Sequence, residues 1–202
     1  TPGTPTIATL VDHLNAREDL RRSDRPWTAA DTLKNVVVGV RHPDGRAELL
    51  AVGLPGDREL DMKRLAARLA PDEPEELGPG DLDGHPDLVR GYIGPGSLGS
   101  GSPGGVRYLL DPRVVPGTGW VTGADAPERH VVDLVAGRDF TADGVVDAAE
   151  VRAGDPCPAC GAGLALARGL EIGHIFQLGR RYAEALGLTV LDEHNRAVPV
   201  SM

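Results

Sequence analysis

Two lysines stand out in a chain that otherwise carries its positive charge on arginine. The sequence has 21 basic residues, and only Lys34 and Lys63 among them are lysines. A lysine ammonium is a compact cation with three donors, which a planar guanidinium cannot imitate. Lys63 lies in a helical pattern and is predicted to be a solvated surface residue. Lys34 opens an apolar run at a strand entrance, so a functional role and an incidental one are both open from this pattern alone.

A glycine-rich loop offers a second kind of chemistry. Residues 91–99 read Gly-Tyr-Ile-Gly-Pro-Gly-Ser-Leu-Gly. Glycines leave backbone N–H groups uncovered, so such a loop can cradle a phosphate, a carboxylate or a developing oxyanion. The loop matches neither a Walker A sequence nor a dinucleotide fingerprint, and most glycine-rich loops are turns. By itself the loop therefore indicates either a turn or an anion site.

The sequence gives no support for a serine or cysteine nucleophile. Ser97 has no recognisable base partner, and no Gly-x-Ser-x-Gly elbow occurs. Cys157 and Cys160 form a Cys-x-x-Cys pair of zinc-knuckle form, but a structural zinc site needs four ligands and no second pair is present. We therefore predict no metal site and no covalent intermediate on the protein.

The amino-acid composition restricts the kinds of partner that the protein can bind. The 202 residues carry a net charge of −9, which argues against general nucleic-acid binding, DNA included, but leaves a local basic pocket possible. No apolar run approaches the roughly 18 residues of a membrane helix. No basic and apolar leader is visible, and the cysteine pair fits a reducing compartment. A cytoplasmic protein is expected.

Hydrophobic patterning predicts a mixed domain of helices and strands. The opening residues read as a helix capped at Thr4, and residues 33–40 and 46–54 as a β-hairpin closed by a turn. A helix over residues 59–70 follows. Strands are expected over 106–110 and 130–135, and a short helix after residue 143. Because helices and strands alternate irregularly with hairpins among them, the fold class is α+β (mixed α/β).

The segment at residues 169–182 has an unusual composition. It reads Gly-Leu-Glu-Ile-Gly-His-Ile-Phe-Gln-Leu-Gly-Arg-Arg-Tyr. Alternation from Leu170 to Phe176 predicts a strand, and a helix is expected from Arg180 to Leu186. The segment resembles the Gly-His-Ile-Phe-Gln-Leu-Gly stretch of bacterial prolyl-tRNA synthetases, in the class II catalytic core just after the editing insertion. Without that resemblance, a buried strand with one hydrogen-bonded histidine would be the simpler interpretation.

Three further segments extend the resemblance over essentially the whole chain. Gly-Pro-Gly-Ser-Leu-Gly at residues 94–99 resembles the glycine loop of the editing insertion, whose fold also occurs in free-standing deacylases of mischarged tRNA(Pro). The opening residues resemble the insertion's entry helix. Asp31-Thr32-Leu33-Lys34 is similar to its strand entrance. The resemblance implies an aminoacyl-tRNA deacylase-like domain over residues 1–145, with a mixed, partly barrel-like sheet and flanking helices. Residues 146–202 would be a fragment of the antiparallel class II core.

The resemblance also implies roles for particular residues. Lys34 and the loop residues Gly96, Ser97 and Gly99 would be catalytic. Four residues would bind substrate: Thr1, Gly94, Asp111 and His130. Asp111 is equally compatible with a simple Asp-Pro turn. His130 is the weakest match, because the aromatic residue and the Asn-Trp pair that usually follow it in the family are replaced by Val-Val-Asp-Leu-Val.

The activity implied is hydrolysis of mischarged Ala-tRNA(Pro) at its acceptor end, without a cofactor. Lys34 would hold the terminal phosphate or the ester carbonyl, amides of residues 94–99 would stabilise the oxyanion, and a ribose hydroxyl would help to activate water. Alanine would fit a pocket near His130 from which proline is excluded by size. The alternatives are a non-catalytic module that binds the tRNA end and a structural insertion.

The full synthetase would be a homodimer that uses ATP and Mg²⁺, neither of which has its site in this segment. The class II motifs 1, 2 and 3 are not found in the chain, so we expect an excised piece of the longer enzyme. His174 and Phe176 would help to form the proline pocket of that enzyme. Since relatives carry other turns in place of Cys-Pro-x-Cys-Gly, a β-turn is expected at Cys157.

Overall fold

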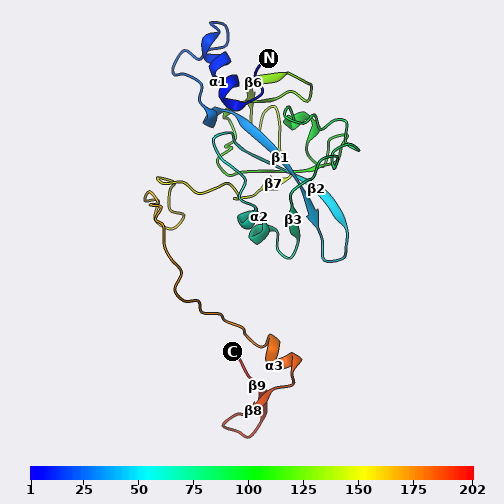
Figure 1. The fold of residues 1–202 in the computed structure, drawn as a ribbon, viewed down its shortest axis with the longest axis vertical. Coiled ribbons are helices and arrows are strands. Elements are labelled where there is room, and N and C mark those ends of the chain that lie inside the picture. Colours follow the sequence, from blue (N-terminus) through cyan, green and yellow to red (C-terminus); the bar gives the residue numbers. More distant parts are fainter. The chain divides into compact units, whose positions relative to one another are not determined.

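The computed structural model describes residues 1–202, and these form two compact units. The first unit is Thr1–Val151 and the second is Arg152–Met202. The first unit continues past the predicted boundary at residue 145 because Val146, Ala148 and Ala149 are buried in one of its hydrophobic clusters. The mixed α/β composition predicted from the sequence is confirmed (Figure 1).

A five-stranded mixed sheet forms the centre of the first unit. Its strand order is β3-β1-β2-β4-β7, and the strands are β1 (Leu33–Arg41), β2 (Ala47–Pro55), β3 (Glu73–Glu75), β4 (Arg107–Leu110) and β7 (Gly144–Val145). The antiparallel β1–β2 pair is the predicted hairpin, and β4 then pairs with β2 in parallel. The sheet is open, with β3 and β7 at its edges, and this order does not establish the partly barrel-like form. The short helix expected after residue 143 is wrong, since β7 occupies that position.

Alternating side chains bury both faces of the sheet. On β2, Ala51 packs into one hydrophobic cluster, whereas Leu50 and Val52 pack into the other. On β4, Tyr108 packs into the same cluster as Ala51, and Leu109 packs into the same cluster as Leu50. Neighbouring strand residues point to opposite faces, so a strand covered on both sides is apolar at nearly every position. Helix α2 (Met62–Leu69) covers the second face through Leu65, which is fully buried.

A second, two-stranded sheet carries the other wall of the candidate site. Strands β5 (Gly119–Gly123) and β6 (His130–Val135) pair in antiparallel fashion, and β6 has its predicted bounds. An isolated parallel bridge between Thr32 and Val121 joins this sheet to the residues that precede β1. Helix α1 (Ile7–Ala16) packs Leu10 and Leu14 against Val121, and Figure 1 shows α1 beside β6.

The start of α1 differs from the sequence-based prediction. Thr6, and not Thr4, caps the helix, and it exchanges hydrogen bonds with Thr9 in a capping box. The Thr4 hydroxyl instead donates to the carbonyl of Thr1 at 2.6 Å. This bond shapes the segment ahead of α1, which reaches the candidate site.

The second unit has little buried apolar surface of its own. It contains α3 (Arg181–Ala185), β8 (Thr189–Leu191) and β9 (Ala197–Pro199), with β8 and β9 paired as a hairpin. The predicted helix is confirmed within one residue at each end, whereas the strand over residues 170–176 is wrong. Those residues pair with no strand, and Leu170, Ile172 and Phe176 are exposed. None of the helices in the structure has the length and apolar character needed to cross a membrane.

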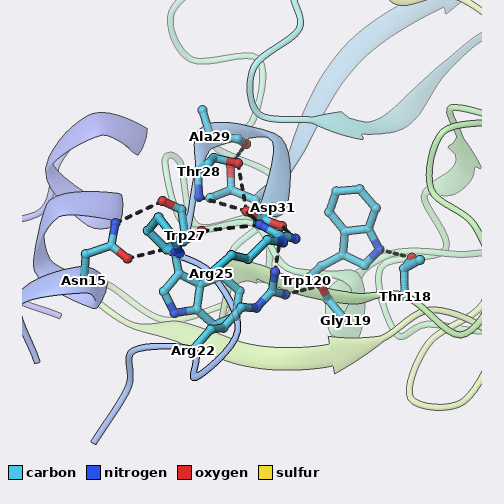
Figure 2. Close-up of polar contacts among 12 residues, drawn as sticks. Asn15, Arg22, Arg25, Trp27, Thr28, Ala29, Asp31, Thr118, Gly119 and Trp120 are labelled. Atoms are coloured by element: carbon cyan, nitrogen blue, oxygen red, sulfur yellow. Dashed lines mark hydrogen bonds and ion pairs between the residues drawn. The ribbon is translucent and has the colours of Figure 1, made fainter. Parts of the chain in front are cut away.

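A buried carboxylate fixes the chain where it enters β1. Asp31 ends a short 3₁₀ helix (Ala29–Asp31) and accepts hydrogen bonds from Arg22 at 2.8 Å and Arg25 at 2.5 and 2.7 Å (Figure 2). Burial alone would raise the pKa of Asp31, but the bonds from Arg25 and Thr28 and the charge of Arg22 hold it well below its usual range. Arg22 also stacks over the Trp27 ring, 3.7 Å from its centre.

Removing this carboxylate should destabilise the first unit. Asp31→Ala leaves two arginines without their shared partner in a mostly buried site, and the expected loss in the free energy of unfolding is about 3 kcal/mol. Asp19→Ala, which removes the partner of Arg17 at the exposed surface, is the matched control and should lower the free energy of unfolding far less. Urea unfolding of both variants measures the difference. Because the pKa of Asp31 is lowered on folding, its contribution is present at neutral pH and is lost as the pH falls below about 4. Equal losses for the two variants would contradict this role.

Candidate functional site

A cavity of about 220 Å³ lies where the start of α1, the start of β1 and the β5–β6 pair meet. Its lining includes Lys34, His130 and Thr122, so one cation, one imidazole and one hydroxyl border the same space. The apolar part of the lining comes from Ile7, Leu10, Leu33, Ile93 and Val121. The structure therefore brings together Lys34 and His130, which lie far apart in the sequence.

His130 lies at this cavity with its imidazole half-buried. Its Nδ1 lies 2.5 Å from the hydroxyl oxygen of Thr1, and its ring centre lies 5.4 Å from that of Tyr92. Burial lowers the pKa of His130, which favours the neutral form of its imidazole. Thr1 and His130, both predicted to bind substrate, are thus in direct contact. A neutral imidazole can donate one hydrogen bond and accept another, which suits contacts to an uncharged ester.

Lys34 is positioned by the first residues of β1 and is mostly buried along its stem. Its Nζ donates to Glu59 Oε2 at 2.8 Å, and the exposed fractions of the two side chains are 22% and 76%. An ion pair with so exposed a carboxylate contributes only about 0–1 kcal/mol. A phosphate or carbonyl oxygen can therefore replace Glu59 as the partner of Lys34 at little cost.

The floor of the cavity is formed by residues that the sequence-based predictions missed. Asn35 donates through Nδ2 to the carbonyl of Ile93 at 2.9 Å and to Thr122 Oγ1 at 3.3 Å, and it accepts from Tyr108 at 2.7 Å. Burial raises the pKa of Tyr108, so its phenol stays protonated and keeps donating to Asn35. An asparagine at the start of an otherwise apolar strand was the available signal, because buried amides need partners.

Close backbone contacts attach the glycine loop to the end of β5. A Cβ added to Gly94 would lie 2.2 Å from the carbonyl oxygen of Gly123, so no side chain fits there. Asp125 Oδ1 accepts from the Gly94 amide and from the Ser97 hydroxyl, each at 2.6 Å. Since Ser97 Oγ donates to a carboxylate inside the fold, its hydroxyl has a structural task, as expected for a serine that is not a nucleophile.

The other loop residues predicted to be catalytic lie apart from the cavity. Gly96 and Gly99 line a separate hollow bordered by Asp125 and Asp143, and the Gly99 amide donates to the carbonyl of Val106 at 2.8 Å. The amides of Gly96 and Ser97 make no backbone hydrogen bond outside the short 3₁₀ helix Pro95–Ser97.

Asp111 does not line the cavity. Its side chain is fully buried and accepts from the Arg113 amide at 2.9 Å and from the Arg113 guanidinium at 3.1 and 3.2 Å. Its own amide continues the pairing of β4 with β2 by donating to Gly53 at 2.8 Å. Asp111 thus closes a turn at the end of β4. Of the two roles predicted for it, substrate binding and an Asp-Pro turn, the contacts fit the turn.

The remaining predicted residues lie in the second unit. His174 Nδ1 is 2.6 Å from Glu171 Oε1, the rings of His174 and Phe176 are 4.1 Å apart, and both side chains are exposed. Cys157 and Cys160 are free thiols in a tight turn closed by the bond from the Gly161 amide to the Cys157 carbonyl. No group of three or more His, Cys, Asp or Glu side chains that could hold a metal ion occurs in the structure.

Comparison with known proteins identifies the family of this chain. Residues 1–140 match the model of the aminoacyl-tRNA editing domain, and the chain belongs to this family. Along its full length it is also similar to proline–tRNA ligases of bacteria. It is 63% identical to that of Nocardioides sp. over 204 residues and 63% identical to that of Kineococcus radiotolerans over 202 residues. It is 59% identical to that of Cutibacterium acnes. These alignments take in 100% of the chain and 34% of each relative, so the chain spans about a third of their length.

The lowered pKa of His130 can be measured directly. In NMR titrations of the folded chain, the His130 imidazole should titrate below about 6.5, the ordinary value for histidine. The same ring in the urea-unfolded chain should titrate at the ordinary value. Because the unfolded state then binds more protons, this residue lowers stability as the pH falls below about 6.5. A folded-state pKa at or above the unfolded value would contradict the neutral imidazole.

The close approach at Gly94 predicts a local cost for any side chain. Gly94→Ala should lower the free energy of unfolding by about 1–3 kcal/mol, because the loop and β5 must move apart. Gly84→Ala is the matched control, since a Cβ at Gly84 meets nothing within 4 Å. Urea unfolding tests both variants, and equal stability of the two would show that the loop moves freely.

Proposed function

We propose that this chain hydrolyses the ester bond of a mischarged tRNA, with Ala-tRNA(Pro) as its substrate. The observation that carries the proposal is the shared cavity of Lys34 and His130 within the part of the chain that matches the editing-domain family. The similarity to proline–tRNA ligases supports tRNA(Pro) as the tRNA. The volume of about 220 Å³ suits a small aminoacyl group and part of its ribose.

In the proposed mechanism, Lys34 exchanges Glu59 for an oxygen of the substrate. The ammonium then holds the ester carbonyl or the terminal phosphate of the tRNA and stabilises negative charge as water adds to the carbonyl. The neutral His130 and the Thr1 hydroxyl orient the aminoacyl end, and a hydroxyl of the terminal ribose helps to activate the water. No step uses a protein nucleophile, since Ser97 is engaged with Asp125.

Selection between alanine and proline is proposed to be steric. Ile7, Leu10 and Val121 form apolar walls that accept a methyl group, and the Asn35–Thr122 contact keeps the floor in place. A site that rejects the larger cognate group by size needs no specific contact with the smaller one.

A second candidate is a module that binds the tRNA end without catalysis. The observation in its favour is the separation of Gly96 and Gly99 from the cavity, which leaves no backbone amide of residues 96–99 in its lining. The oxyanion would then depend on Lys34 alone. Turnover separates the two candidates, because a binding module retains affinity for tRNA and leaves the ester intact.

For the longer relatives we propose that the region matching residues 146–202 belongs to the charging core. His174 and Phe176 would contribute to a proline pocket there, in a homodimeric enzyme that uses ATP and Mg²⁺. The exposure of the apolar residues between Leu170 and Leu178 supports a partner surface for this segment.

The test is hydrolysis of Ala-tRNA(Pro) beside Pro-tRNA(Pro). The chain should release alanine and leave proline attached, and Lys34→Ala should lower the rate by about 100-fold because it removes the main stabilising charge. Lys63→Ala is the matched control, since Lys63 is the other lysine and lies exposed on α2. An unchanged rate for Lys34→Ala would overturn the assigned role of Lys34. If the folded wild-type chain hydrolyses neither ester, the result favours the binding module.

A further inference from the structure

A groove of about 560 Å³ adjoins the cavity of Lys34 and His130. The two spaces share four lining residues, Lys34, Asn35, Gly91 and Ile93. Lys34 therefore stands in the wall between them, and its ammonium bonds to Glu59 on the groove side. A ligand that reached Lys34 from the groove would place its end in the cavity.

The walls of the groove are largely apolar. Alternation along β1 puts Lys34, Val36 and Val38 on one face, and all three line the groove. Leu60 and Met62 line it from the start of α2, and Leu77 and Leu82 from the connection that follows β3. Apolar side chains can pack against the flat face of a nucleobase, although this groove has no aromatic residue for stacking.

Two charged side chains of the groove have no partner in the fold. Arg90 lines the groove, is exposed, and makes no side-chain hydrogen bond or ion pair within the chain. Glu76 also lines it, and its carboxylate is equally free, whereas the adjacent Glu75 pairs with Arg41 at 2.6 Å. The groove thus offers an anion site and a separate hydrogen-bond acceptor.

We infer that this groove binds the last nucleotides of the tRNA acceptor end, and that Arg90 and Glu76 position them. Arg90 would bind a backbone phosphate, and Glu76 would accept from the exocyclic amine of a base. Every base of the CCA terminus common to tRNAs carries such an amine, so one carboxylate suits this end. This role rests on the proposed hydrolysis and adds to it the subsite that holds the RNA while the ester lies at Lys34.

The dinucleotide CpA is the probe, because it carries the bases and one phosphate but no ester. In an NMR titration with the full chain, CpA should shift the amides of Val36, Val38 and Arg90. Arg90→Ala should weaken CpA binding about five- to tenfold through loss of a phosphate contact. Arg129→Ala is the matched control, since Arg129 is exposed, has no ion pair and lines neither space, and it should bind CpA as the wild type does.

Two further variants test the assignment of each charge. Glu76→Gln should reduce the preference for CpA over UpU, which lacks exocyclic amines, by about fivefold. Glu59→Gln should strengthen CpA binding about twofold, because it frees Lys34 from its exposed partner. With Ala-tRNA(Pro) as substrate, Arg90→Ala should raise KM and leave kcat unchanged, as expected for a residue that positions the RNA.

The outcomes separate the subsite from the proposed activity. If the chain hydrolyses Ala-tRNA(Pro) but CpA shifts no groove residue, or binds equally well to Arg90→Ala, the groove is not the nucleotide subsite and the hydrolysis stands. If CpA binds in the groove with the expected variant effects but no ester is cleaved, the subsite stands and the proposed hydrolysis fails.

Discussion

The buried carboxylate of Asp31 is the contact on which the candidate site depends most. It binds Arg22 and Arg25 from the preceding loop, and Arg22 also donates to the carbonyl of Gly119 at the start of β5. One anion thus joins the loop after α1, the entrance of β1 and the second sheet. Lys34 follows three residues after Asp31, so its backbone position is set by this network. A carboxylate so firmly bonded stays ionised throughout the neutral range.

A second constraint acts on the opposite wall of the cavity. Gly94 and Gly123 approach too closely for any side chain, and Asp125 ties the same loop to the end of β5. The loop therefore holds Ile93 and Tyr92 against the cavity floor and His130. The charge of Lys34 also matters for the site. Lys34 is a cation in a chain of net charge −9, and its ion-pair partner is an exposed glutamate. A weak partner keeps this cation in place while leaving it available to the proposed substrate.

Sequence patterns predicted the local elements well and the relations between distant residues poorly. The hairpin of β1 and β2, helix α2 and strand β6 follow from periodicity and turn residues, because these signals are local. The strand expected over residues 170–176 failed because alternation predicts a strand only where a neighbouring strand is available to pair. Lys34 was singled out by its type and position, and His130 by resemblance. The bonds of Asp125 to the glycine loop and the turn role of Asp111 depend on tertiary contacts, which the sequence does not display.

We propose that Lys34 and His130 face one aminoacyl group. The most direct test is an NMR titration with an adenosine that carries alanine through a non-hydrolysable 3′-amide, following the Lys34 side-chain ammonium and the His130 imidazole. Both signals should shift together with one dissociation constant, and the proline amide should shift neither. A ligand that binds while leaving His130 unperturbed, or a proline amide that binds as well as the alanine amide, would contradict the account.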